Sequence, residues 1–251
     1  MTTRTSHRWK HRPGSFDAQN SADLFATDNR WGIPKLQHTP LTTIPNWLAP
    51  YGTQIRSKDG VGDGAVHFFL DDYRFERVWN RPNKALVSLE KFSTLLTPDF
   101  SLYHDWPLSL QLWNTYRSRW CGTFWQQQGF TVIPTISWSD EESYAFCFCG
   151  VPAQGVVAVS TVGVRLNDAL EQALFVRGFQ AMVKRLQPVL VLCYGKIPAI
   201  CHQWVEVICY PTRWMGIRHA RHNNPAAVNP QKLKVADVSS SFILHPSSFS
   251  S

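Results

Sequence analysis

Short apolar runs that each end in polar residues constrain the fold of this chain more than any other feature of its sequence. Each run is four to six residues long, is rich in Val, Ile and Phe, and is almost continuously hydrophobic. Continuous runs are typical of strands that are buried on both faces, as in parallel sheets. We find eight such runs and expect a strand in each, at residues 33–36, 66–70, 94–97, 131–136, 145–149, 156–160, 189–194 and 205–210.

Two long segments between these runs have the spacing of amphipathic helices. Residues 107–128 follow Asp105, a candidate N-cap, and stop at Gly129. Residues 167–187 begin with Asn167 as a candidate cap and end at a proline. Each helix leads directly into an apolar run, which is the rhythm of βαβ units.

This order of elements predicts an α/β fold that is (β/α)8-barrel-like, irregular or incomplete. An open, mostly parallel α/β sheet is the alternative. Only six residues join the runs 145–149 and 156–160, too few for a crossover helix, so an antiparallel hairpin is the other reading of that pair. With 44% apolar residues, 11 Trp and 15 Phe, the chain is expected to bury a substantial core.

The net charge of +7 comes from the two ends of the chain. Residues 1–16 carry four Lys or Arg and residues 213–234 carry five, in both cases without an acid. We therefore expect a basic flexible arm over 1–30, a single α/β domain over 31–212 and a basic, Pro/Ser-rich extension over 213–251. Basic ends suit a polyanion, although solvated tails that aid solubility are the alternative. The residues predicted to contact DNA or RNA are Arg4, Arg8, Lys10, Arg12, Arg213, Arg218 and Arg221.

The sequence also limits where the protein acts. It has no run of 18 apolar residues and no apolar stretch behind its basic N-terminus, so we expect a cytoplasmic protein without membrane contact. The six cysteines form no CxxC pair, which favours buried, reduced thiols. The alternative is a metal site whose spacing matches no known zinc module, built from Cys147, Cys149, Cys201 and His202.

Polar side chains gather at the downstream ends of the apolar runs. Because the C-terminal ends of parallel strands meet at one edge of a sheet, we expect a site there. Carboxylates on neighbouring strand ends can share a proton, bind a divalent cation or act as acid and base. The predicted catalytic residues are Asp72, Asp99 and Asp71. The predicted substrate-binding residues are Arg74, Ser101, Ser137, Trp138, Ser160 and Lys196.

A structural role is the alternative for the same acids. Asp71 or Asp72 would then pair with Arg74 or Arg77. Asp99 would instead accept backbone N–H bonds in the turn after its preceding proline.

Several catalytic signatures are missing from the sequence. It contains no GxGxxG, GxxxxGK[ST], HExxH or GxSxG motif. Dinucleotide binding, P-loop hydrolysis, zincin chemistry and ordinary serine-hydrolase chemistry therefore lose support.

Five segments of the chain resemble a known family in the same order. They are FFLDDYRFERVWNRP (68–82), LTPDFSLYHDWP (96–107), QLWNTYRSRWCGTFWQQQGFTVIPTISWSD (111–140), GVPAQGVVAVSTVGV (150–164) and VLCYGK (191–196). They resemble the uncharacterised family known as domain of unknown function 4417, which occurs in bacteria, phages and other mobile elements. The resemblance covers roughly residues 30–210. It implies that LDDYRFE, TPDFS, PTISW, VSTVGV and YGK belong together, and it implies no activity.

Three functions are open at this point. The first is an enzyme whose acidic site carries out acid/base or metal-assisted hydrolysis of a substrate such as a nucleotide or nucleic acid. The second is a non-catalytic nucleic-acid-binding protein that uses its basic ends. The third is a phage or plasmid protein that binds a host protein through exposed tryptophans.

Overall fold

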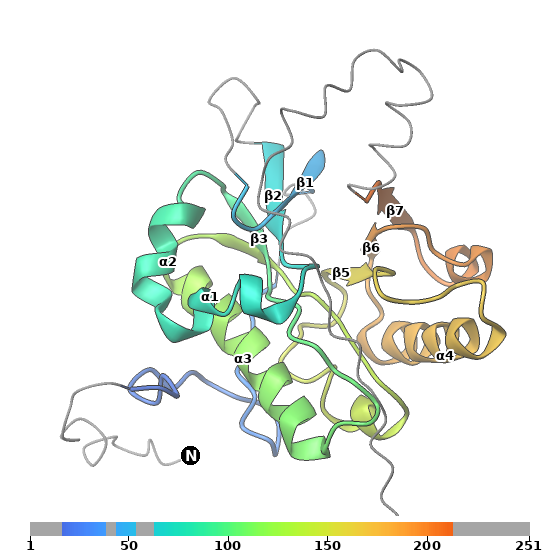
Figure 1. Ribbon diagram of the computed structural model, residues 1–251, viewed down its shortest axis with the longest axis horizontal. Coiled ribbons are helices and arrows are strands. Elements are labelled where there is room, and N and C mark those ends of the chain that lie inside the picture. Colours follow the sequence, from blue (N-terminus) through green and yellow to red (C-terminus); the bar gives the residue numbers. More distant parts are fainter. Residues whose placement is uncertain (1–16, 39–43, 54–62, 213–251) are drawn as a thin grey trace, which may run out of the picture. The chain divides into compact units, whose positions relative to one another are not determined.

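The computed structural model describes residues 17–38, 44–53 and 63–212 of this chain (Figure 1). The described residues from 17 to 211 belong to a first compact unit, and Thr212 belongs to a second one. All the helices and strands of the described residues belong to the first unit.

In the described residues, seven parallel strands form two sheets. The first sheet has the order β1 (Trp47–Pro50), β2 (Gly64–His67), β3 (Thr94–Leu96) and β4 (Thr131–Ile133). The second has the order β5 (Val156–Ser160), β6 (Leu190–Tyr194) and β7 (Val207–Tyr210). Neighbouring strands of each sheet are therefore consecutive in the chain, and because they are parallel each pair needs a crossover connection.

A single bridge joins the two sheets. Thr135, just beyond β4, pairs in parallel with Ala158 in the middle of β5. The amide of Ile136 donates to the Ala158 carbonyl at 2.8 Å, and the Ala158 amide donates to the Pro134 carbonyl at 2.8 Å. The chain order of the strands thus continues from the first sheet into the second.

Helices make the crossovers between strands. Between β2 and β3 lie η3 (Asp72–Arg74), α1 (Arg77–Asn80) and α2 (Pro82–Leu89). Each later crossover contains one helix: α3 (Leu108–Gln127), η4 (Glu142–Ala145), α4 (Ala169–Leu186) and η5 (Ala199–Gln203). No helix among the described residues is long and apolar enough to cross a membrane.

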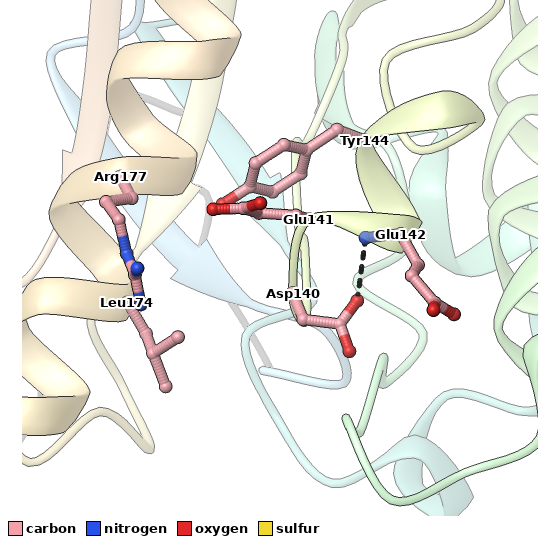
Figure 2. A pocket seen from close by; sticks show the side chains of 6 residues that line it. All are labelled: Asp140, Glu141, Glu142, Tyr144, Leu174 and Arg177. Atoms are coloured by element: carbon pink, nitrogen blue, oxygen red, sulfur yellow. Dashed lines mark hydrogen bonds between the residues drawn. The ribbon is translucent and has the colours of Figure 1, made fainter.

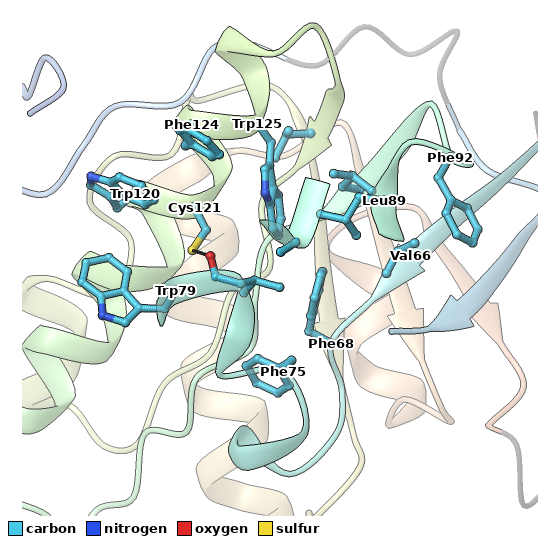
Figure 3. Packing of buried hydrophobic residues seen from close by; sticks show 14 of the residues in the cluster. Val66, Phe68, Phe75, Trp79, Leu89, Phe92, Trp120, Cys121, Phe124 and Trp125 are labelled. Carbon is cyan, nitrogen blue, oxygen red and sulfur yellow. Dashed lines mark hydrogen bonds between the residues drawn. The ribbon is translucent and has the colours of Figure 1, made fainter. Parts of the chain in front are cut away.

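The largest core cluster lies between the four-stranded sheet and helices α1, α2 and α3 (Figure 3). Aromatic rings dominate it. Phe68 stacks on Trp125 with ring centroids 5.4 Å apart, and Trp79 meets Trp120 edge to face at 5.3 Å. Large rings bury the most apolar surface per residue, so this cluster anchors α3 against the sheet.

Two further clusters complete the interior. One packs α4 and the residues around η4 on the three-stranded sheet, with Phe179 and Met182 fully buried. The other contains side chains from both sheets, including Ala65 and Leu96 from the first and Leu192 from the second. The described part of residues 1–30 also contacts this unit, because the Trp120 indole donates to the Asp23 carbonyl at 2.8 Å.

The predicted α/β class with parallel strands is confirmed, whereas a (β/α)8 barrel is not. Six of the eight apolar runs contain strands. Residues 33–36 make only an isolated bridge between Thr27 and Pro34, because a proline has no N–H for a ladder. Residues 145–149 lie in η4 and the turn after it, so the alternative hairpin is also wrong. The continuous apolarity of this run reflects burial in a turn.

One strand, β1, was not expected from the sequence. It lies at the edge of its sheet, is four residues long and ends in Pro50, so it shows no apolar run. The two long helices agree with the prediction within two residues. Their predicted caps are wrong: α3 has Pro107 at its N-cap without a side-chain bond, and Asp168 caps α4 in place of Asn167.

Candidate functional site

The segments after β2 and β3 are tied together by Asp72. Its carboxylate accepts the backbone N–H of Ser101 at 3.1 and 3.2 Å and the Ser101 hydroxyl at 2.9 Å. The side chain of Asn114, on α3, donates to the Ser101 carbonyl at 2.7 Å. Arg117 in turn donates to the Asn114 side chain at 2.7 Å and forms an ion pair with Glu76. Asp72 therefore organises a network that links two strand ends to a helix.

The segments after β3 and β4 are tied together by Asp99. The Ser137 hydroxyl donates to its carboxylate, and the residue as a whole is partly exposed although protein atoms surround the carboxyl group. Burial raises the pKa of Asp99 to about 6; the Ser137 bond lowers it, the Asp72 charge raises it further, and the Arg119 charge lowers it. A carboxyl group with such a pKa can accept and return a proton near neutral pH.

Arg119 places a buried positive charge beneath these strand ends. Its guanidinium donates to the carbonyls of Thr135 and Cys147 at 2.9 Å and to that of Cys149 at 3.3 Å. Burial lowers the pKa of Arg119 to about 10, so the side chain remains charged at neutral pH. Carbonyl groups satisfy its hydrogen bonds but carry no net charge. The nearby Asp99 is consequently an important source of negative charge for it.

A polar stripe on α3 supplies most of the residues that sequence reasoning missed. Its buried members include Gln111, Asn114, Thr115 and Ser118, at the i, i+3, i+4 and i+7 spacing of one helix face. The Gln111 side chain accepts the Ser139 hydroxyl at 2.6 Å, which extends the network to the segment after β4. Buried polar stripes are uncommon, and this spacing is the signal that could have revealed it.

His67, at the end of β2, was also missed. Its ring is fully buried and packs against Tyr194 at 4.2 Å and Phe69 at 5.3 Å. Burial lowers the pKa of His67 to about 3, so the imidazole is neutral. Nδ1 accepts the Phe69 amide at 3.2 Å, which assigns the ring proton to Nε2, and Nε2 has no partner among the described residues. His67 lies within an apolar run, so the sequence pattern did not mark it as a candidate site residue.

The structure brings together four of the predicted site residues and places the other five elsewhere. Asp72 bonds to Ser101 and Asp99 bonds to Ser137, and the charge of the first aspartate acts on the second. Neither Asp71 nor Asp72 belongs to one of the ion pairs found in the described residues, which argues against the alternative pairing with Arg74 or Arg77.

The remaining five residues have other surroundings. Asp71, Arg74 and Lys196 are exposed. Trp138 packs on Phe175 of α4, with ring centroids 5.3 Å apart. Ser160 donates to the Tyr194 carbonyl at 3.3 Å, which links the ends of β5 and β6.

A groove of about 310 Å³ lies between η4 and α4 (Figure 2). It is lined by Asp140, Glu141, Glu142, Tyr144, Leu174 and Arg177. The Asp140 carboxylate already accepts the amides of Glu142 at 3.1 Å and Ser143 at 3.3 Å, so it caps η4. Within the described residues no group of three or more His, Cys, Asp or Glu side chains is arranged to hold a metal ion. This includes the four residues considered as a zinc site.

The seven basic residues predicted to contact nucleic acid all lie outside the described residues. They are Arg4, Arg8, Lys10, Arg12, Arg213, Arg218 and Arg221.

Comparison with known proteins agrees with the predicted resemblance. Residues 25–211 match the family described as Domain of unknown function (DUF4417). The chain is 43% identical over 215 residues to the "Gene 1 protein" of Mycobacterium phage D29, covering 84% of this chain and 78% of that protein. It is 40% identical over 215 residues to the "Gene 1 protein" of Mycobacterium phage L5, covering 84% and 92%. No solved structure matches the chain significantly.

Proposed function

Since this chain belongs to the family of domain of unknown function DUF4417, whose description assigns no activity, we propose a function from its own residues: hydrolysis by acid/base catalysis at Asp99. One observation carries the proposal. The carboxyl group of Asp99 lies just after a strand end and is enclosed by protein atoms, and its pKa is raised to about 6. Retaining a group that is unfavourable to ionise is typical of functional sites.

The neighbouring residues suit this role. The Ser137 bond orients the Asp99 carboxylate, and the residue is partly exposed, so the attacking water would come from its solvent side. Asp99 would take a proton from that water as it attacks the substrate and would return the proton to the leaving group. Asp72 is the positioning residue, because its three bonds to Ser101 hold the next segment in place.

A nucleotide or nucleic acid is the substrate class we favour. The basic ends suit a polyanion. Two carboxylates are fewer ligands than a dedicated metal site needs, but Mg²⁺ commonly uses one or two carboxylates together with substrate phosphates. Asp72 and Asp99 are the residues that would hold a cation brought in with the substrate.

We also propose that the strands of both sheets surround a shared interior, as in a barrel. Three observations support it besides the bridge between the sheets. The third core cluster draws side chains from both sheets. His67 of β2 packs against Tyr194 of β6. The Tyr210 hydroxyl of β7 donates to the Pro45 carbonyl just before β1 at 2.5 Å.

The test compares Asp99→Asn and Asp72→Asn with the matched control Asp71→Asn, whose carboxylate is exposed. Thermal shift is measured with Mg²⁺ or Mn²⁺, nucleotides and short DNA or RNA, followed by hydrolysis assays on the ligands that stabilise the wild type. We expect the ligand response to disappear in the first two variants and to persist in the control. If Asp99→Asn melts far below the wild type without ligand, Asp99 is structural and the proposal fails.

Nucleic-acid binding without catalysis is the second candidate, favoured by the absence of acids from residues 1–16 and 213–234. Binding of short DNA would then weaken steeply with salt and disappear when both segments are deleted, while Asp99→Asn would leave it unchanged. Binding to a host protein is the third candidate, and stable co-purification of one host protein that resists high salt would favour it.

A further inference from the structure

Two cysteines face each other across strands β6 and β7. Cys193 and Cys209 are register partners in this parallel pair, so their side chains project from the same face of the sheet. Neighbouring strands lie about 4.8 Å apart, which is within the Cα separation that a disulfide spans. Both cysteines are free thiols in this structure.

The two thiols also influence each other. The Cys193 side chain lowers the pKa of Cys209 to about 6 against the opposing effect of burial, with a smaller contribution from His202. Cys209 and burial in turn raise the pKa of Cys193, whose thiol donates to the Gly195 carbonyl at 3.8 Å. Cys209 is therefore the member of the pair that loses its proton more readily.

Accessibility divides the pair in the same way. Cys209 is exposed on an edge strand, whereas Cys193 is fully buried. The other four cysteines, Cys121, Cys147, Cys149 and Cys201, are buried, and burial raises the pKa of each. An accessible thiolate beside a resolving thiol is the arrangement of a redox-sensitive site.

We propose that Cys209 and Cys193 form a peroxide-sensitive thiol pair, in which Cys209 reacts first and Cys193 resolves the product as a disulfide. The Cys209 thiolate attacks a hydroperoxide, the O–O bond breaks, and an alcohol, or water from hydrogen peroxide, leaves with a proton. The resulting Cys209 sulfenic acid is attacked by the Cys193 thiol, which releases water and forms the S–S bond. Two electrons pass from the two sulfurs to the hydroperoxide.

The disulfide would join the edge strand to its neighbour, and an external thiol would reverse it. Reaction at this pair does not depend on the proposed hydrolysis at Asp99. Cys201 is a competing partner, because it is the third sulfur close enough to influence Cys193.

The experiment uses the full-length chain treated with hydrogen peroxide, alkylated under denaturing conditions and mapped by mass spectrometry. We expect free thiols to fall from six to four, with one linked pair, Cys193–Cys209. Cys209→Ser should keep its five thiols. Cys193→Ser should stop at a Cys209 sulfenic acid that dimedone traps, and the control Cys201→Ser should still form the disulfide.

Three results would overturn the proposal. The first is a disulfide between Cys209 and Cys201, and the second is a disulfide between two chains through Cys209. The third is a free Cys209 thiol that reacts with peroxide no faster than the thiol of the buried Cys121. Circular dichroism of each variant shows whether it is folded. If Cys193→Ser fails to fold, Cys193→Ala takes its place in the trapping experiment.

Discussion

Among single residues, the strand ends and the adjacent helix α3 hold ionisable groups away from water. Asp99 resists ionisation, Arg119 keeps a charge in the interior, and His67 is neutral with an unpartnered nitrogen. Leaving a buried polar group unpaired costs about 1–3 kcal/mol, so such groups oppose folding. Their concentration at one edge of the strands supports a function there.

Asp99 predicts a specific pH dependence of stability. Its pKa is 3.8 for the unperturbed group and about 6 in the folded protein, so its stabilising contribution is complete below pH 4 and lost as pH rises to 6. The loss amounts to about 3 kcal/mol by the relation of about 1.4 kcal/mol per pKa unit. Asp99→Asn should therefore gain stability relative to the wild type when the pH is raised from 4 to 7.5.

Urea unfolding of both proteins at pH 4, 5, 6 and 7.5 measures this difference. The free energy of unfolding of the variant, minus that of the wild type, should rise with pH and level off above pH 6 to 7. Asp71→Asn, at an exposed aspartate, is the control. A difference that is independent of pH would mean that Asp99 ionises normally in the folded protein.

At the scale of elements, α4 depends on a close approach by the segment after β4. Gly178 lies where a Cβ would come within 2.1 Å of the Trp138 indole nitrogen. The ring of Trp138, a residue expected from the sequence to bind substrate, lies against this helix. The glycine thus permits the contact in the middle of a helix, where glycine is otherwise unfavourable.

We predict that Gly178→Ala lowers the free energy of unfolding by about 1–3 kcal/mol, because the indole must move out of a packed site. In a Trp138→Leu background the same substitution should be neutral or stabilising by up to about 1 kcal/mol, since alanine favours helix. Denaturant unfolding of the four proteins of this double-mutant cycle measures the coupling. Equal effects in both backgrounds would show that the contact is unimportant.

At the scale of the described unit, the two sheets are connected at both ends of the strand order. The bridge at Ala158 joins β4 to β5, and the Tyr210 hydroxyl bond reaches the segment before β1. Long-range links of this kind make separate sheets unfold together.

Tyr210→Phe tests the second connection. The substitution removes one hydrogen bond and leaves the Pro45 carbonyl without that donor, so we expect a loss of about 1–2 kcal/mol. Hydrogen exchange should accelerate in β1 and β7 more than in β3. Tyr73→Phe, at an exposed tyrosine, is the control and should change neither measurement. Exchange that accelerates in β7 alone would argue against the connection.

Residue patterns alone were enough to predict the class of fold, the two long helices and the family. The spacing of apolar residues along the chain indicates which positions are buried. This spacing differs between strands that are buried on both faces and amphipathic helices. It also indicated that Asp72 and Asp99 follow strands. It failed where apolar residues fill a turn, as at 145–149, and where an edge strand is short, as at β1.

Which residues meet depends on the folded chain. Asp72 binds Ser101 across 29 positions and Asp99 binds Ser137 across 38, separations over which no local pattern carries information. The pKa of Asp99 likewise depends on burial and on charges from other segments. Hydrophobic burial is roughly non-directional and is visible in composition, whereas hydrogen bonds and charge pairs require defined distances that exist only after the chain has folded.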